Sequence, residues 1–405
     1  MPHRHPPSWT LTARWVFPVG RPPLPRGTVT VCGERITAVE PHGGRQADLD
    51  LGNVAVLPGL VNAHTHLDLS GLGGRAPPTE DFSAWLRGVV LYRRQRTPTQ
   101  VEADTRAGLA QGLAHGTTLL ADIAAGGLSW PVLADAPLRA VVFYELLGLA
   151  PARVRQAWAG ACAWLAAHPA TATCRPGLSP HAPYSVHRAL YGLAARRARA
   201  QNFPLTTHLA ETASELELLA HRRGPLVEFL SGLGAWHPDG LVSSPGAVLR
   251  LRHQATLFAH GNYLDAGAAI PPSGTVVYCP RTHAAFGHGP HPFRAFLAAG
   301  VRVALGTDSL ASNPDLDVLA EARFLHARHP DLPGEVLLRM ATLSGAEALG
   351  WQAETGSLAP GKSADLVVVP LPDADAPDPH QFLFASPLPV QAVLWCGRWT
   401  CGTVS

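Results

Sequence analysis

The sequence has very little charge, and one basic residue type is almost missing. Only 15% of its 405 residues are charged, and Lys362 is the single lysine. A net charge of +2 gives no basis for a nucleic-acid or membrane-surface partner. Hydrophobic residues make up 46% of the chain, which is typical of a well-buried globular protein and excludes a disordered one. The length allows one large barrel and a smaller domain.

Signals of membrane insertion, secretion and cysteine-based sites are also lacking. No apolar run is long enough to span a bilayer, and the Pro-, His- and Arg-rich start has no apolar signal-peptide core. The six cysteines are scattered without a C-x-x-C pair, so neither a zinc knuckle nor a disulfide framework is indicated. We therefore expect a cytoplasmic protein with reduced thiols.

The two ends of the chain share a β-rich character. Residues 8–57 contain WTLTARWVF, GTVTVCG and RITAVE, separated by Pro- and Gly-rich connections, and SADLVVVPL and PVQAVLWCGRW follow near the C-terminus. The pattern predicts one small β-sandwich built from both termini. We place it at residues 1–57 and 356–405, with residues 58–355 as a separate catalytic domain.

The middle of the chain alternates between apolar β-runs and Ala/Leu/Arg-rich stretches with helical spacing. Eight runs recur, from AVLPGLVNAH to VRVALGTDS, with helical stretches such as TQVEADTRAGLAQGLAH between most of them. Eight strand–helix rounds predict an α/β fold, a (β/α)8 TIM-like barrel whose active site lies at the carboxyl ends of the strands. The alternative, a doubly wound open sheet, predicts a G-x-G-x-x-G loop after the first strand, and none is found there.

The first β-run ends in a His-x-His pair, His64 and His66. Residues two apart in a strand point to the same face, so both imidazoles would converge on one point. A chance pair is expected among 20 histidines, and His3 and His5 in the proline-rich start form one that no strand directs.

Polar residues recur where the other predicted strands end. A lone histidine after an apolar run is more often structural. Polar residues that recur at the ends of several barrel strands instead predict one shared site. The residues in this register are His64, His66, His181, His208, Glu211, His260 and Asp308.

Three histidines and an aspartate favour Zn²⁺, and Fe²⁺ stays open as the alternative. Binuclear barrels often use a carboxylated lysine at the end of strand 4, and Lys362 lies in the C-terminal segment instead. We therefore expect a single divalent metal, which lowers the pKa of a bound water. Asp308 can accept the proton of that water, Glu211 can shuttle it, and His260 can orient the hydroxide. An alternative interpretation of Glu211 is a carboxylate at the start of a surface helix, but its spacing from His208 favours the catalytic role.

These residues resemble the amidohydrolase superfamily, in its mononuclear deaminase and chlorohydrolase branch. The similarity spans nearly the whole chain through PGLVNAHTHLDLS, SPHAPYS, THLAET, AHG, YCPRTH, LGTDSLASNPDLDVLAEAR and GSLAPGKSADLVVV, in the order of the family. The resemblance implies Glu211 as proton shuttle, His260 as hydroxide partner and His181 as a substrate contact. The metal ligands that it implies are His64, His66, His208 and Asp308.

Two departures from the family pattern affect the substrate contacts. The usual Pro-x-Ser-Asn after strand 7 reads PRTH, so His283 stands where Asn is typical. Trp85 is a further candidate substrate contact. By spacing from it, the ribose-binding glutamate of S-adenosylhomocysteine deaminases is replaced by Arg94, whose alternative interpretation is an exposed helix residue.

Within the branch, the motifs are most similar to 6-aminodeoxyfutalosine deaminases of menaquinone synthesis, whose substrate is an adenine nucleoside with a carboxyphenyl group. A carboxylate calls for an arginine, and Arg281 is the first candidate and Arg94 the second. Other purine or S-adenosylhomocysteine deaminases, chlorohydrolases and a non-catalytic scaffold barrel remain alternatives. Family habit suggests a homodimer. The His-rich segment with His288 and His291 reads as a solvated loop or an adventitious metal site.

Overall fold

The computed structural model describes residues 8–75, 77–251, 255–374 and 376–402, so the pair His3 and His5 lies outside it. Internal packing divides the chain into two compact units. One contains the described chain up to residue 62, residues 110–119 and the chain from 317 onward, and the other contains residues 63–109 and 120–316. The domain boundaries at residues 57 and 355 stay predictions.

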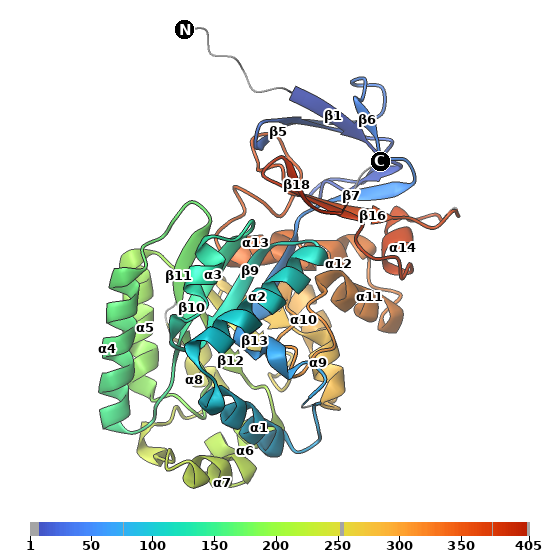
Figure 1. Ribbon diagram of the computed structural model, residues 1–405. Coiled ribbons are helices and arrows are strands. Elements are labelled where there is room, and N and C mark those ends of the chain that lie inside the picture. The colour runs from blue at the N-terminus through green and yellow to red at the C-terminus, as the bar shows by residue number, and fades with distance from the viewer. Residues whose placement is uncertain (1–7, 76, 252–254, 375, 403–405) are drawn as a thin grey trace. The chain divides into compact units, whose positions relative to one another are not determined.

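Eight strands form one parallel sheet whose order follows the chain (Figure 1). They coincide with the eight apolar runs, which confirms the TIM-like barrel. Thr65 and Asp308 form a parallel bridge, and the Asp308 N–H donates to the His64 carbonyl at 3.0 Å, so the first strand meets the chain after the last. The strands are β8 (Leu60–Thr65), β9 (Thr117–Ala124), β10 (Arg139–Leu146), β11 (Cys174–Pro180), β12 (Leu205–Leu209), β13 (Thr256–His260), β14 (Gly274–Tyr278) and β15 (Arg302–Leu305).

The barrel strands read as continuous apolar runs because parallel strands of this fold are covered on both faces. All eight residues of β9 are buried, for example. The α-helices that follow the strands include the predicted helical stretches. They are α1 (Phe82–Gln95), α2 (Pro98–Ala114), α3 (Trp130–Ala134), α4 (Pro151–Ala167), α5 (Arg188–Gln201), α6 (Ala213–His221), α7 (Pro225–Gly232), α8 (Pro245–Leu249), α9 (Pro280–Ala285), α10 (Phe293–Ala298), α11 (Val318–Arg328), α12 (Gly334–Met340), α13 (Leu343–Ala348) and α14 (Pro379–Phe384). Short 3₁₀ turns are η1 (Leu67–Leu72), η2 (Ala125–Gly127) and η3 (Pro238–Gly240).

The ends of the chain form two further sheets, of which the four-stranded one is N-terminal and the six-stranded one contains strands from both ends. One has the order β5-β4-β1-β6, and the other β18-β17-β16-β7-β2-β3, where β7 and β16 pair although they lie far apart in sequence (Figure 1). Residues of both sheets, such as Leu11, Val56 and Leu366, share one buried apolar core. The strands are β1 (Ser8–Thr12), β2 (Trp15–Val16), β3 (Leu24–Pro25), β4 (Thr28–Cys32), β5 (Arg35–Glu40), β6 (Leu49–Asp50), β7 (Val54–Pro58), β16 (Leu366–Pro370), β17 (Ala392–Trp395) and β18 (Arg398–Gly402).

The structure also describes the cysteines and the hydropathy of the helices. All six cysteines are free thiols in it. Within the described part of the chain, no helix combines the length and the hydropathy that crossing a membrane requires.

Barrel closure depends on a close backbone approach at Gly306, directly after β15. A Cβ at this position would lie 2.8 Å from the His64 Cβ and 3.0 Å from Val277 Cγ1, whereas a Cβ at Gly267 meets nothing within 4 Å. We expect Gly306→Ala to lower the free energy of unfolding by about 2 kcal/mol, because overpacking forces backbone shifts. Gly267→Ala is the matched control. Denaturant unfolding measures both, and equal stability of the two variants would contradict the close approach.

Candidate active site

The strand ends bring the histidines of the sequence pattern into one buried cluster. The ligand atoms of His64, His66 and His208 lie within 4.8 Å of one another, and so do those of His64, His260 and Asp308. All five side chains are buried. Two groups that share His64 therefore surround one point at the carboxyl end of the barrel.

These imidazoles are held in the neutral form that binds a metal. Burial, followed by the neighbouring histidines, lowers the pKa of His64 and His66 well below the ordinary value. Burial also lowers the pKa of His208 to about 3. A neutral imidazole offers a nitrogen lone pair, which is what a divalent cation requires.

Several buried ring nitrogens of the cluster have no suitable hydrogen-bond partner in the part of the chain that the structure describes, as is expected of nitrogens that bind a metal. His66 Nε2 and His208 Nε2 face each other at 3.1 Å. Among the described residues, neither ring nitrogen of His64 has a hydrogen-bond partner, nor has His260 Nε2. Buried polar atoms without partners are costly, so the donor set fits one divalent cation. The end of β11, where a bridging lysine would stand, is followed by His181.

Asp308 turns one carboxylate oxygen toward the histidines. Its Oδ1 lies 3.7 Å from His64 Nε2 and 3.6 Å from His66 Nε2. Its Oδ2 accepts a hydrogen bond from Ser312 Oγ at 2.6 Å. The hydroxyl thus fixes the rotation of the carboxylate and leaves Oδ1 toward the cluster.

Glu211 lies beside this cluster, on the short connection between β12 and α6. Its Oε1 is 3.5 Å from His260 Nε2. Burial, followed by the charges of Asp308 and Glu215, raises the pKa of Glu211 well above its ordinary value. A carboxyl group with a raised pKa can both take and give a proton near neutral pH.

The backbone at these strand ends is unusual for residues other than glycine. Ala210, His260 and Asp308 have φ angles of 50°, 68° and 58°. This left-handed conformation costs energy in residues with a Cβ and is enriched at functional sites. In Thr212-x-x-Glu215 the threonine caps α6, and the Glu215 carboxylate accepts from the N–H groups of Ala210 and Glu211 at 3.0 and 3.1 Å. These bonds compensate the strained turn that presents Glu211.

His181 borders the cluster without joining either ligand group. Its ring centroid is 4.8 Å from that of His208, and its Nδ1 contacts Ser185 Oγ at 2.6 Å. Its backbone carbonyl accepts from His208 Nδ1 at 2.9 Å, which leaves His208 Nε2 facing His66 Nε2. Its remaining nitrogen, Nε2, lies 4.0 Å from Glu145 Oε1.

Two adjoining cavities lead away from the cluster. The inner cavity, of about 50 Å³, is lined by the predicted residues His66, Trp85, His181, His208, Glu211, His260 and Asp308, among others. The outer cavity, of about 570 Å³, has an apolar wall from α1, α7 and the loop after β10, and it is also lined by Arg94 and Arg153. The two cavities share Leu86, Val89, Arg93, His181 and Tyr184.

Arg281, the first candidate for a substrate carboxylate, is not among the lining residues of either cavity. Its guanidinium pairs with both carboxylate oxygens of Asp315, at 3.0 and 2.5 Å. Arg94 is exposed and lines the outer cavity. The structure therefore brings Arg94, and not the guanidinium of Arg281, to the proposed binding space.

The histidines near residue 288 take up internal hydrogen bonds. His288 Nδ1 contacts the Tyr263 hydroxyl at 3.1 Å, and His291 Nε2 donates to the His260 carbonyl at 2.7 Å. Neither belongs to a potential metal-binding group among the described residues.

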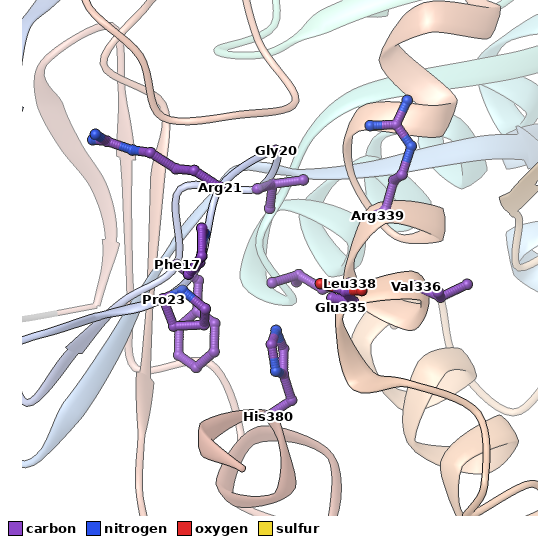
Figure 2. Close-up of a pocket in the computed structure, with 11 residues that line it drawn as sticks. Phe17, Gly20, Arg21, Pro23, Glu335, Val336, Leu338, Arg339 and His380 are labelled. Atoms are coloured by element: carbon purple, nitrogen blue, oxygen red, sulfur yellow. The ribbon is translucent and has the colours of Figure 1, made fainter.

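A third cavity, of about 370 Å³, lies elsewhere in the chain, between the β2–β3 loop, α12 and α14 (Figure 2). Both arginines that line it have partners elsewhere: Arg21 donates to the Val39 carbonyl, and Arg339 pairs with Glu347, both at 2.7 Å. In Figure 2 both arginines extend away from the hollow. The histidine cluster lies in the other unit, which makes the inner and outer cavities the candidate active site.

The sequence reasoning missed Arg93, which connects the site to two buried carboxylates. Its guanidinium binds Asp68 at 2.9 and 3.1 Å and Glu145 at 3.1 Å, and Nη2 lies 3.4 Å from His66 Nδ1. Burial opposes the charge on Arg93, but the two carboxylates outweigh it and raise its pKa. The neighbouring Arg94 and Arg96 hid this role in sequence. The helical period of this segment, which places Arg93 on the inward face of α1, could have indicated its role.

Comparison with known proteins identifies the family. A profile of the amidohydrolase family matches residues 55–400. A 5-methylthioadenosine/S-adenosylhomocysteine deaminase of Moorella thermoacetica is 31% identical over 387 residues, which cover 90% of this chain and 85% of the relative. An aminodeoxyfutalosine deaminase of Deinococcus radiodurans is 30% identical over 360 residues, covering 80% of this chain and 81% of the relative.

Solved structures with the same fold include an adenosine deaminase of Xanthomonas campestris with bound zinc. It has a TM-score of 0.82 and 26% identity, over 98% of this chain and 94% of that one. The aminofutalosine deaminase of Helicobacter pylori in complex with methylthio-coformycin has a TM-score of 0.84 over 97% of this chain and all of that one. At 23% identity, this second likeness concerns the fold.

The ligand set predicts how metal content responds to mutation. We expect His208→Asn to abolish stoichiometric zinc binding, because it removes one of three converging nitrogens. His181→Asn should retain zinc, because His181 lies outside both ligand groups. Elemental mass spectrometry after dialysis measures the zinc content. A folded His208→Asn protein with one zinc per chain would refute the assignment.

Arg93 and Arg94 form a matched pair on α1. Arg93→Met leaves the carboxylates of Asp68 and Glu145 buried without their cation, and we expect a loss of about 3 kcal/mol in unfolding free energy. Arg94→Met removes an exposed side chain and should change stability by less than about 0.5 kcal/mol. Urea unfolding monitored by circular dichroism compares them. Similar losses of unfolding free energy in both variants would contradict the pairing of Arg93 with Asp68 and Glu145.

Proposed function

We propose that this chain, which belongs to the amidohydrolase family and is a hydrolase of carbon–nitrogen bonds, deaminates an adenine-type nucleoside. Water adds to the ring carbon that carries the amino group, the carbon–nitrogen bond breaks, and ammonia leaves. The product is the corresponding hypoxanthine nucleoside. One observation carries the proposal: the inner cavity, lined by metal-ligand residues and Glu211, adjoins a cavity large enough for the rest of a nucleoside.

In this proposal a divalent metal, with zinc as the best candidate, supplies the Lewis acid that brings the pKa of water toward neutrality. The residues that would hold it are His64, His66, His208 and Asp308. His181 and Asp308 both line the inner cavity, where they would contact the substrate around the reacting carbon.

Glu211 would carry a proton from water to the ring nitrogen next to the reacting carbon. Burial, followed by the charge of Asp308, raises the pKa of Glu211, which favours the protonated form that a proton donor requires. His260, 3.5 Å from Glu211, would orient the water and stabilise the charge that develops on it. Asp308 would accept the second proton of the water and pass it to the leaving amine. His181 would donate to the substrate ring from the cavity wall.

The outer cavity supports a nucleoside with a large substituent. Its wall contains Leu147, Phe229 and Leu230, and Arg94 and Arg153 add positive charge. Our best candidate is 6-aminodeoxyfutalosine, an intermediate of menaquinone synthesis. Its phenyl ring would pack on the apolar wall, and its carboxylate would bind the two arginines. Because Arg281 pairs with Asp315, we assign the carboxylate to Arg94 and Arg153 instead.

The similarity to a 5-methylthioadenosine/S-adenosylhomocysteine deaminase makes thio-substituted adenine nucleosides a second candidate substrate class. Their named substrates are also adenine nucleosides with substituents, so the apolar wall favours both classes. A chlorotriazine would leave most of the outer cavity unused. A scaffold role leaves the intact donor set and Glu211 without purpose. The homodimer and the cytoplasmic location stay predictions.

Ammonia release by zinc-loaded protein tests the function. We expect 6-aminodeoxyfutalosine to be turned over with a kcat/KM at least about tenfold above that of adenosine, since a charge-assisted hydrogen bond contributes about 1.5–3 kcal/mol. Glu211→Gln should lower kcat by about 10²–10⁴-fold, because it removes the proton carrier. The panel also includes 5-methylthioadenosine, S-adenosylhomocysteine, guanine and a chlorotriazine.

The outcomes separate the reaction from the substrate. If another amine is the preferred substrate, the protein is a deaminase as proposed, but 6-aminodeoxyfutalosine is not its substrate. Full activity of Glu211→Gln on the preferred substrate would discard the assigned proton carrier. No ammonia from any compound, with zinc bound, would overturn the proposed function.

A further inference from the structure

His283 stands where the family typically has asparagine, and the structure gives this difference a role. The residue lies on α9, directly after β14, and it is buried. Its Nδ1 lies 3.0 Å from Asn262 Oδ1, and its Nε2 lies 2.7 Å from the Gly289 carbonyl oxygen. Both ring nitrogens face oxygen acceptors, and since a neutral imidazole carries a single N–H, each tautomer donates to only one of them.

Asn262 connects His283 to the loop that carries Glu211. Asn262 is buried and lies two residues after the end of β13. Its Nδ2 donates to the Glu211 carbonyl oxygen at 3.0 Å. The hydrogen bonds thus run from Glu211 through Asn262 to His283, across the ends of the neighbouring strands β12, β13 and β14.

The same peptide segment is held on its other side. Glu215 Oε2 accepts from the Glu211 N–H at 3.1 Å, and Asn262 donates to the Glu211 carbonyl. Hydrogen bonds on both backbone groups fix the direction in which the Glu211 side chain leaves the loop. Proton transfer is sensitive to such placement, because an error of about 1 Å can cost about 10²-fold in rate.

We propose that His283 is a positioning residue for Glu211, acting in the tautomer that carries its proton on Nδ1 and donates it to Asn262 Oδ1. The inference rests on the proposed function, since it assigns Glu211 as the proton carrier. Asn262 already donates through Nδ2, so its Oδ1 needs a donor to stay oriented. Without that donor the amide is held, among the described residues, only by its bond to the Glu211 carbonyl, and its orientation is less well fixed.

Two substitutions separate the two bonds of the His283 ring. Asparagine places its amide near the Nδ1 position, and glutamine places its amide near the Nε2 position. His283→Asn therefore keeps the bond to Asn262 and loses the bond to Gly289. His283→Gln does the reverse. A role in packing alone would not distinguish the Nδ1 position from the Nε2 position.

His288 provides a control from the same segment. Its ring centroid is 5.4 Å from that of His283, and its Nδ1 contacts the Tyr263 hydroxyl rather than Asn262. We use His288→Asn rather than a change at His291, because His291 donates to the carbonyl of His260.

The experiment compares kcat, KM, zinc content and Tm of the three variants on the preferred substrate. We expect His283→Gln to lower kcat by about 10–100-fold with KM changed by less than about threefold, at unchanged zinc content. His283→Asn and His288→Asn should keep kcat within about threefold of the unmodified protein. Equal kcat values for His283→Asn and His283→Gln would overturn the proposal.

Crystal structures of the zinc-loaded His283→Asn and His283→Gln proteins test the proposal independently of turnover. We expect the Asn262 amide and the Glu211 side chain to be displaced in His283→Gln and retained in His283→Asn. If Glu211 keeps its place beside His260 in both variants, His283 does not position it. Should the unmodified protein release no ammonia at all, the proposed function fails, and the crystal structures still decide the role of His283.

Discussion

Closure of the barrel is the constraint on which the site depends. Asp308 follows the last strand, yet its N–H donates to the carbonyl of His64 on the first strand. This bond, and the absence of a Cβ at Gly306, put a carboxylate from one end of the barrel sequence against imidazoles from the other. If the first strand and the chain after the last one separated by the width of a methyl group, the two ligand groups that share His64 would no longer surround one point.

The electrostatics of the site follow from its burial. The histidines are neutral because a buried cluster of imidazolium ions would repel one another in a medium that solvates charge poorly. The buried carboxylates of the site differ in their surroundings. Asp68 and Glu145 pair with Arg93, whereas burial, followed by the charges of Asp308 and Glu215, raises the pKa of Glu211. A single metal placed among the histidines adds positive charge where the structure collects lone pairs.

Substrate choice, in this view, belongs to a different part of the molecule from the chemistry. The inner cavity is built at the strand ends, and the outer cavity mostly by α1, α7 and the loop after β10. Relatives with different named substrates are 31% and 30% identical to this chain over most of its length. Loops and helices of this kind vary without disturbing the strand ends, which explains why similar chains act on different nucleosides.

The sequence by itself determined the barrel, because eight apolar runs separated by helical stretches leave few other folds, and the polar residue after each run already indicates one shared edge. The pattern also selected the residues of the buried cluster, since register along a strand is visible in sequence. It did not distinguish Arg93 from Arg94, it did not reveal the partner of Arg281, and it assigned no role to His283. Those side chains are long or lie on helices and loops, and their partners (Asp68, Asp315 and Asn262) are distant in sequence or on other elements. Only the tertiary structure decides which charge or hydrogen-bond partner such a side chain meets, because that choice depends on packing between elements and not on the period within one.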